Sequence, residues 1–240
     1  REAITEASAA AVRELARETV LPSAATPLGA DVLESAFHQF RRAFDPFHGG
    51  FGGAPKFPQP SILRFLLREH ARTGNAEALE MTLQTLDAMS RGGIHDHLGG
   101  GFHRYSVDAV WRVPHFEKML YDQAQLAAAY IEAFQVTGEE RLAAVARGIL
   151  DYVASEMTAP EGGFYSAEDA DSAADPATPE IKREGAFYLW TLPEIEAVLG
   201  PDEARRFALV YGVEEHGNVA GDPHGEFAGK NILFLSGEDA

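Results

Sequence analysis

The sequence predicts a mainly all-α protein built from helical hairpins whose connecting loops gather at one end. Two observations predict this fold. Six segments carry apolar residues at helical spacing. A Gly-Gly-Phe turn recurs at Phe51, Phe102 and Phe164, 51 and 62 residues apart, with two of these helices between each pair. Each repeat unit is therefore a helical hairpin, and stacking such units places all three turns at the same end.

The six long helices follow from their apolar stripes and from the residues that stop them. Pro22 ends the first helix, Gly74-Asn75 separates the third from the fourth, and Pro114 is a favourable first-turn residue for the fifth. The expected helices are 1–22, 31–44, 61–72, 76–91, 114–136 and 139–157.

Residues 161–240 differ in character from the helical part. The acidic run 169–180, with Pro176 and Pro179, predicts an exposed loop. Segments 187–190 and 232–235 are typical of short strands, and two short helices are expected near 193–199 and 202–211. We expect 1–160 to form the hairpins and 161–240 to form a loop-rich elaboration of the same domain.

Composition excludes several classes of function. The chain has 20 Lys+Arg against 37 Asp+Glu, a formal charge of −17, which disfavours nucleic acid and anionic membranes as partners. It has no cysteine, so disulfides and thiolate metal sites are excluded for this stretch. No apolar run approaches the roughly 18–20 residues of a transmembrane helix, and we expect a cytoplasmic protein. Because it opens on Arg1 without Met, we interpret the chain as a piece of a longer one.

The predicted helix 114–136 is the one most suited to carry a site. Placed on a helix, His115, Lys118 and Asp122 share one stripe, and most of the remaining surface is apolar. The pattern favours a buried inner helix whose amino end opens into a cavity. The alternative is that His115 and Asp122 are hydrogen-bonded core groups or caps.

The candidate site residues cluster around the glycine-rich turns. Four histidines fall within 21 positions, among several aspartates. A histidine–carboxylate pair in a cavity can move protons to and from sugar carbons or glycosidic oxygens. The candidate catalytic residues are His115, Asp122, His103, Asp96, Glu168 and Asp169. The candidate substrate-binding residues are the aromatic platforms Trp111, Tyr105, Phe102 and Tyr165, together with Asp108 and Lys118. The alternative is that these histidines merely bond backbone in tight loops.

Metal and cofactor sites are less favoured. His95 and His97 resemble two zinc ligands but lack a fixed third one, which His103 or Asp108 would have to supply. Residues 169–180 only partly follow a calcium-loop pattern, because alanines replace a ligand and the turning glycine. The glycine-rich loops have neither a P-loop nor a dinucleotide-binding pattern. We therefore expect no metal and no cofactor.

Several long strings resemble one family. Segments 49–58, 99–108, 111–122, 164–172 and 184–191 are similar to the YyaL-type family of thioredoxin-domain-containing proteins, the group of the mammalian spermatogenesis-associated protein. The resemblance spans nearly the whole chain. It implies a full-length protein with an amino-terminal thioredoxin-like domain followed by an (α/α) toroid, similar to six-hairpin glycosidases and to N-acylglucosamine and cellobiose 2-epimerases.

The resemblance implies that the chain is the central portion of the toroid. It has six long helices where a closed ring has twelve, and it lacks the thioredoxin-like part, which agrees with the absence of cysteine. No redox activity is therefore expected of this piece.

Two functions are compatible with these residues. The first is a carbohydrate-active toroid of the sugar epimerase or glycoside hydrolase type, with its acid–base groups at the loop end. The second is a non-catalytic module that binds a ligand or a partner, attached to the thioredoxin-like domain. The expected partners are a small molecule such as a sugar and that thioredoxin-like domain. His115 or Asp122 facing Glu168 or Asp169 across roughly 5–10 Å of open cavity favours the enzyme. Burial of these groups in mutual hydrogen bonds favours the module.

Overall fold

The computed structural model describes residues 2–19, 29–175, 177–219 and 227–237. The chain divides into two units, residues 1–36 and 37–240. The helices are α1 (Glu2–Thr19), α2 (Ala30–Ala43), α3 (Pro60–Thr73), α4 (Ala76–Arg91), α5 (Leu120–Thr137), α6 (Glu140–Ser155), α7 (Leu192–Leu199) and α8 (Pro201–Tyr211). Among the described helices, none has the length and apolar character needed to span a bilayer. The predicted stop at Pro22 lies outside the described residues.

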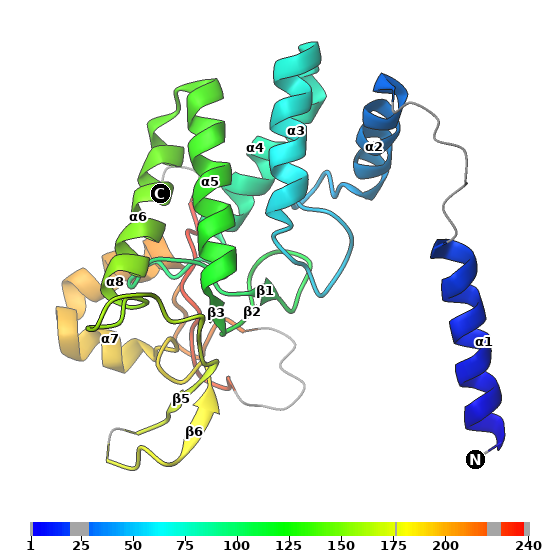
Figure 1. Cartoon of the computed structure of the whole chain (residues 1–240). Coiled ribbons are helices and arrows are strands. Elements are labelled where there is room, and N and C mark those ends of the chain that lie inside the picture. The colour runs from blue at the N-terminus through cyan, green and yellow to red at the C-terminus, as the bar shows by residue number, and fades with distance from the viewer. Residues whose placement is uncertain (1, 20–28, 176, 220–226, 238–240) are drawn as a thin grey trace. The chain divides into compact units, whose positions relative to one another are not determined.

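Two helical hairpins form the centre of the second unit. α3 and α4 are joined by Gly74-Asn75, and α5 and α6 by Gly138-Glu139. Gly74 and Gly138 close α3 and α5 in the left-handed conformation, at φ 74° and 73°, which glycine adopts without steric cost. The Asn75 side chain caps the start of α4 by accepting hydrogen bonds from the Glu77 and Ala78 amides. The tight turns therefore lie at one end of the hairpins, and the glycine-rich loops lie at the other, as predicted (Figure 1).

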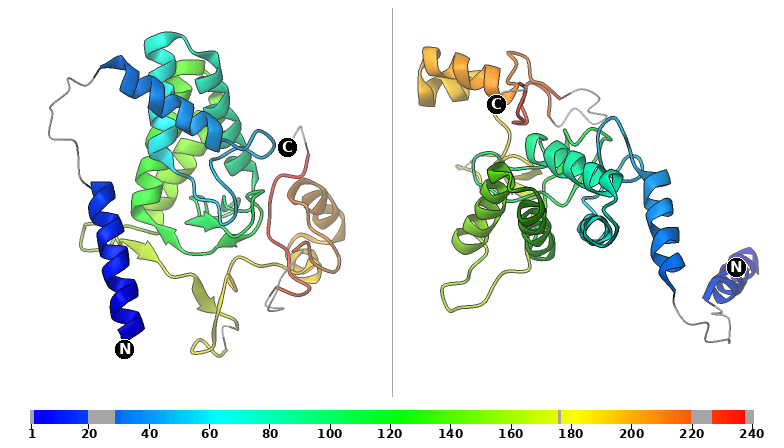
Figure 2. Two further views of the ribbon diagram at one scale, coloured as in Figure 1. Left: turned by 90° about the vertical axis from the view of Figure 1, so that its right-hand side faces the viewer. Right: turned by 90° about the horizontal axis from the view of Figure 1, so that it is seen from above.

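The hairpins pack side by side through α3 and α5, and the main core lies between them. Both views in Figure 2 show α3–α6 as one bundle. Fully buried side chains from all four helices and from the loops meet there, among them Leu63, Leu86, Leu126, Ile149 and Phe102. A smaller cluster around Phe116, Leu189 and Ile232 joins the carboxy-terminal part to the loop end.

In the described part of the chain, six short strands form three antiparallel pairs at the loop end. They are β1 (Tyr105–Ser106) with β2 (Pro114–His115), β3 (Lys118–Met119) with β4 (Ala167–Glu168), and β5 (Asp171–Ala173) with β6 (Lys182–Glu184). A single bridge also joins Lys56 to Ser106. Each Gly-Gly-Phe turn is closed by one bridge to its phenylalanine, from Phe44, His95 and Thr158 respectively.

The prediction of a helix from Pro114 is wrong. α5 begins only at Leu120, and Pro114–Met119 is extended. His115 pairs with Tyr105, and Lys118 pairs with Glu168. The backbone groups that a helix would use are taken by these ladders, which join residues far apart in the sequence. His115 and Lys118 therefore do not share a helical stripe with Asp122.

The predicted carboxy-terminal strands are also wrong. Residues 185–188 form a turn after β6, with the Tyr188 amide bonded to the Gly185 carbonyl. Of the predicted strand residues, only Trp190 makes a ladder contact, with Asn231, and residues 232–235 are not assigned to a strand. The acidic run 169–180, predicted as a loop, contains the strand β5, and Pro176 lies outside the described residues. α7 and α8 lie close to the predicted short helices.

Candidate functional site

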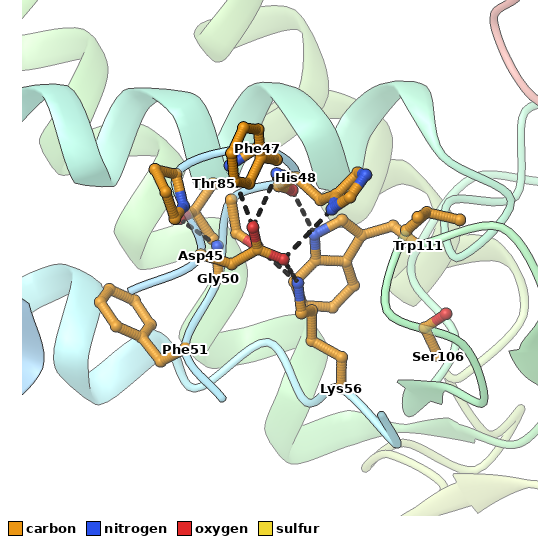
Figure 3. A network of polar contacts seen from close by, with 12 residues as sticks. Asp45, Phe47, His48, Gly50, Phe51, Lys56, Thr85, Ser106 and Trp111 are labelled. Atoms are coloured by element: carbon orange, nitrogen blue, oxygen red, sulfur yellow. Dashed lines mark hydrogen bonds and ion pairs between the residues drawn. The ribbon is translucent and has the colours of Figure 1, made fainter. Parts of the chain in front are cut away.

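Two aspartate–lysine pairs, each with a buried lysine and a partly buried aspartate, shape the loop end. In the first, Lys56 is fully buried and its Nζ donates to Asp45 Oδ2 at 2.7 Å and to the Gly49 carbonyl at 2.9 Å (Figure 3). Asp45 Oδ1 accepts from the Phe47 and His48 amides. Burial works to raise the pKa of Asp45, but the Lys56 ammonium and these amides outweigh it, so this pKa lies well below its usual value.

The second pair repeats the arrangement of the first, with its aspartate 51 residues and its lysine 62 residues further along the chain. Lys118 Nζ donates to Asp96 Oδ2 at 2.8 Å and to the Gly100 carbonyl at 3.0 Å. Asp96 Oδ1 accepts from the Leu98 and Gly99 amides, as Asp45 does from its own loop. Burial works to raise the pKa of Asp96, and Lys118 more than offsets this, so the pKa is lowered. The Lys118 ammonium also lies 4.2 Å from the centre of the Tyr152 ring.

These pairs were not predicted from the sequence, although the sequence contains a signal for them. Asp45 and Asp96 each stand six residues before the phenylalanine of a Gly-Gly-Phe turn. The repeat is therefore Asp-x-x-x-Gly-Gly-Phe in its first two copies, and the lysine comes from further along the chain. Lys118, predicted to bind substrate, is only 1 % exposed and is committed to Asp96. That prediction is corrected.

A cavity of about 510 Å³ opens beside the second pair. We call it the histidine pocket, and its polar lining is His95, Asp96, His97 and His103. Its aromatic lining is Phe116, Phe187, Tyr188 and Trp190. Burial lowers the pKa of His95 to about 3, helped by the neighbouring His97. Burial also lowers the pKa of His103 to about 3, helped by Lys118. Both imidazoles are therefore neutral near pH 7.

Another polar group lies around His115, which does not line the histidine pocket. His115 Nδ1 donates to Glu184 Oε1 at 2.7 Å, and its ring stacks on Tyr105 with centroids 4.9 Å apart. Its Nε2 lies 3.7 Å from Glu117 Oε2. We call His115, Glu184, Tyr105, Glu117, Arg104 and Asp122 the His115 cluster. His115 and Glu184 are both partly exposed, at 26 % and 32 % of their side chains.

Asp122 supplies an unusual carboxyl to this cluster. It lies in the first turn of α5 and is buried, and its Oδ2 has no hydrogen-bond partner among the described residues. Arg104 Nε is likewise buried without a partner in that part of the chain, although Arg104 Nη1 donates to Glu117 at 2.7 Å. Burial raises the pKa of Asp122 to about 6, with Glu117 adding to the rise and Arg104 opposing it.

The raised pKa of Asp122 predicts how the Asp122→Asn variant will behave. A folded-state pKa above the unfolded value means that the folded protein holds the proton more tightly, so stability falls as pH rises from about 4 to about 6. Asparagine does not ionise, so the variant should gain about 1–3 kcal/mol over the parent at pH 7.5 and little at pH 4. Urea unfolding at both pH values measures the gain. An equal difference at the two values would contradict the assignment.

Glu168 is held by two tyrosines. Its oxygens accept from the Tyr152 hydroxyl at 2.5 Å and from the Tyr188 hydroxyl at 2.6 Å. Burial and the neighbouring Glu168 both raise the pKa values of these tyrosines, so the hydroxyls stay protonated and donate. Asp169, its neighbour, is exposed, and its Oδ2 lies 3.9 Å from the Lys182 ammonium. The two predicted carboxylates therefore have different environments.

The structure places the remaining predicted residues as follows. Trp111 is fully buried, and its indole donates to the His48 carbonyl, so it cannot serve as a platform for a sugar. Phe102 is likewise fully buried, stacked between His95 and Tyr130, which corrects the same prediction there. Asp108 accepts from three amides and from the Ser106 hydroxyl, an arrangement that fixes its own loop. Tyr165 is 51 % exposed.

The proposed metal ligands do not converge. Within residues 2–19, 29–175, 177–219 and 227–237, no three His, Asp or Glu side chains are grouped as they would be around an ion. Three of the histidines instead form a hydrogen bond from one ring nitrogen to a backbone carbonyl. His95 bonds the carbonyl of Ser90, His97 that of Gly92 and His103 that of Phe116. The bonds of His95 and His97 match the alternative that the histidines bond backbone in tight loops, whereas His103 bonds a carbonyl 13 residues away.

Comparison with known proteins defines the class of the fold. A sugar epimerase from a ruminal bacterium superposes with a TM-score of 0.52 at 15% sequence identity, over 75% of this chain and 55% of that one. Cellobiose 2-epimerase from Spirochaeta thermophila superposes with a TM-score of 0.51 at 20% identity, over 62% and 42% of the two chains. The predicted fold class, a mainly all-α partial (α/α) toroid with short β elements, is thereby confirmed.

Sequence comparison then identifies a similar protein. The chain is 48% identical over 224 residues to spermatogenesis-associated protein 20 of Homo sapiens. The match covers 87% of this chain but only 28% of the human protein, so the chain spans less than a third of that relative's length. No family model matches the chain.

Proposed function

We propose that this chain contributes part of the active site of a carbohydrate-active protein, of the sugar epimerase or glycoside hydrolase type. The observation that carries the proposal is the partly exposed His115, held by Glu184 at 2.7 Å within a cluster that also contains a protonatable Asp122. The likeness of the fold to sugar epimerases supports the same class.

The His115 cluster has the groups that proton transfer needs. Because Nδ1–H of His115 donates to Glu184, the lone pair of the neutral ring is on Nε2, which can accept a proton. The Glu184 carboxylate would stabilise the imidazolium that results. Asp122, with a pKa of about 6, can donate a proton near neutral pH and accept one again. Acting on a sugar, such groups would remove a proton from the carbon next to a carbonyl, or protonate a glycosidic oxygen.

The experiment uses the intact protein in D₂O with glucose, mannose, N-acetylglucosamine and cellobiose. Epimerisation would replace the hydrogen at C2 with deuterium, which proton NMR detects, and hydrolysis would release reducing ends from the disaccharide. Exchange or hydrolysis above the rate without protein supports the proposal. If sugars bind but neither exchange nor hydrolysis occurs, only a binding function remains.

That binding function is the second candidate, and a specific observation favours it. Asp96 bonds Lys118, and Glu168 bonds two tyrosines, so two of the four predicted catalytic carboxylates are engaged in partly buried hydrogen bonds. Such a module would bind a sugar without altering it.

The wider proposal concerns the full-length protein. The full-length protein would include a thioredoxin-like domain that contacts this toroid. That domain would carry any thiol chemistry, in line with the absence of cysteine in this chain. The human relative is more than three times the length of the matched segment, which leaves room for such a domain. We also propose that the full-length protein is cytoplasmic. Assaying thiol–disulfide exchange and sugar turnover in the full-length protein and in this segment alone would test the division of roles. Thiol chemistry should require the full-length protein.

A further inference from the structure

We propose that the histidine pocket binds an uncharged, hydroxyl-bearing ring, and that the ligand of this protein is therefore an unphosphorylated sugar. The inference rests on the proposed function for the choice of a sugar. It goes beyond that function by assigning a recognition site separate from the His115 cluster, and by excluding charged sugars.

The hydrogen bonds of the three histidines determine what the pocket offers. A carbonyl oxygen can only accept, so the ring nitrogen bonded to it must carry the hydrogen. This places the hydrogen on Nδ1 in His95 and His103, and on Nε2 in His97. In the neutral rings, the other nitrogen has a lone pair and only accepts. The ring nitrogens left for a ligand therefore call for a ligand that donates, as a sugar hydroxyl does.

The charge of the pocket disfavours anions. Its described lining contains no lysine and no arginine. The nearby Lys118 ammonium already bonds Asp96 and the Gly100 carbonyl, so the charges of this pair offset each other. A phosphate would enter without a cation to meet it, and burying an unpaired charge is costly. An uncharged ligand meets no such cost.

The aromatic lining supplies the apolar surface that a ring-shaped ligand needs. Phe187 is 72 % exposed on one side of the pocket, and Tyr188 and Trp190 follow it along the chain. A cavity of about 510 Å³ is within the size range of small-molecule sites, which pair apolar walls with a few fixed polar groups.

The test is calorimetric titration of the intact protein with glucose, mannose and their 6-phosphates. At least one free sugar should bind, and its 6-phosphate should bind at least about tenfold more weakly. His97→Phe, which keeps a ring and removes the acceptor, and Phe187→Ala should each weaken binding about tenfold. Phe164→Ala, the same truncation at an exposed residue outside the pocket lining, should leave binding unchanged.

The outcomes separate this inference from the proposed function. Equal or tighter binding of the 6-phosphates, or unchanged affinity in both pocket variants, would overturn the inference even if the protein turns over a sugar. Binding that needs Phe187 and His97 but persists in His115→Ala would support the pocket, whether or not turnover is found.

Discussion

Replacing Lys118 with methionine is expected to lower the free energy of unfolding by about 3–5 kcal/mol. Lys118 is 1 % exposed, and its ammonium satisfies Asp96 and the Gly100 carbonyl. Methionine fills a similar volume, so the loss comes from leaving a buried carboxylate without its cation. Chemical denaturation of parent and variant, followed by circular dichroism, measures the difference.

A matched control isolates the buried charge. Lys182→Met makes the same exchange at a lysine whose side chain is 55% exposed, where ion pairs contribute at most about 1 kcal/mol. A comparable loss in both variants would show that the Lys118–Asp96 pair has no special part in stability. The double variant Lys118→Met with Asp96→Asn should recover part of the loss, because it leaves no unpaired charge.

Replacing His115 with glutamine is expected to reduce turnover of any sugar substrate by at least about a hundredfold, with folding near normal. The ring is partly exposed, so its loss leaves little cavity, and glutamine can still donate to Glu184. The amide cannot accept and return a proton as Nε2 can. Deuterium exchange at C2 or release of reducing ends measures the rate, and thermal unfolding checks the fold.

Two further variants make the His115 result specific. His38→Gln, the same exchange at an exposed histidine of α2, should leave turnover unchanged. Glu184→Gln should lower turnover less than His115→Gln and shift its pH profile, because the amide still accepts from Nδ1 but cannot stabilise an imidazolium. Turnover by His115→Gln at the parent rate would show that His115 is not the acid–base group.

The parts of the fold that local sequence signals determine were predicted correctly. α3, α4 and α6 lie close to their predicted residues because apolar periodicity, Asn75 and the turn glycines are all local. Pro114–Met119 was mispredicted because its conformation depends on strand pairing with residues 105–106 and 167–168, which helical periodicity cannot reveal.

The candidate site was only partly predictable for the same reason. The sequence indicated His115 and Asp122, but not Glu184, which lies 69 residues from its histidine partner. It also could not distinguish a buried aromatic ring from an exposed one. Trp111 is fully buried, whereas Tyr165 in a comparable loop is half exposed, and only the packing around each loop decides this.

The bridge between Lys56 and Ser106 connects the first glycine-rich loop to the strand beside His115. Ser106 pairs with Lys56 on one side and belongs on the other side to β1, which also pairs Tyr105 with His115. A substitution that displaces Lys56 would therefore disturb the position of His115, the proposed proton-transfer group. If a mutation in the first loop reduces activity, displacement of His115 through Ser106 and β1 is therefore a sufficient explanation. Such a loss would not by itself place the first loop in the active site.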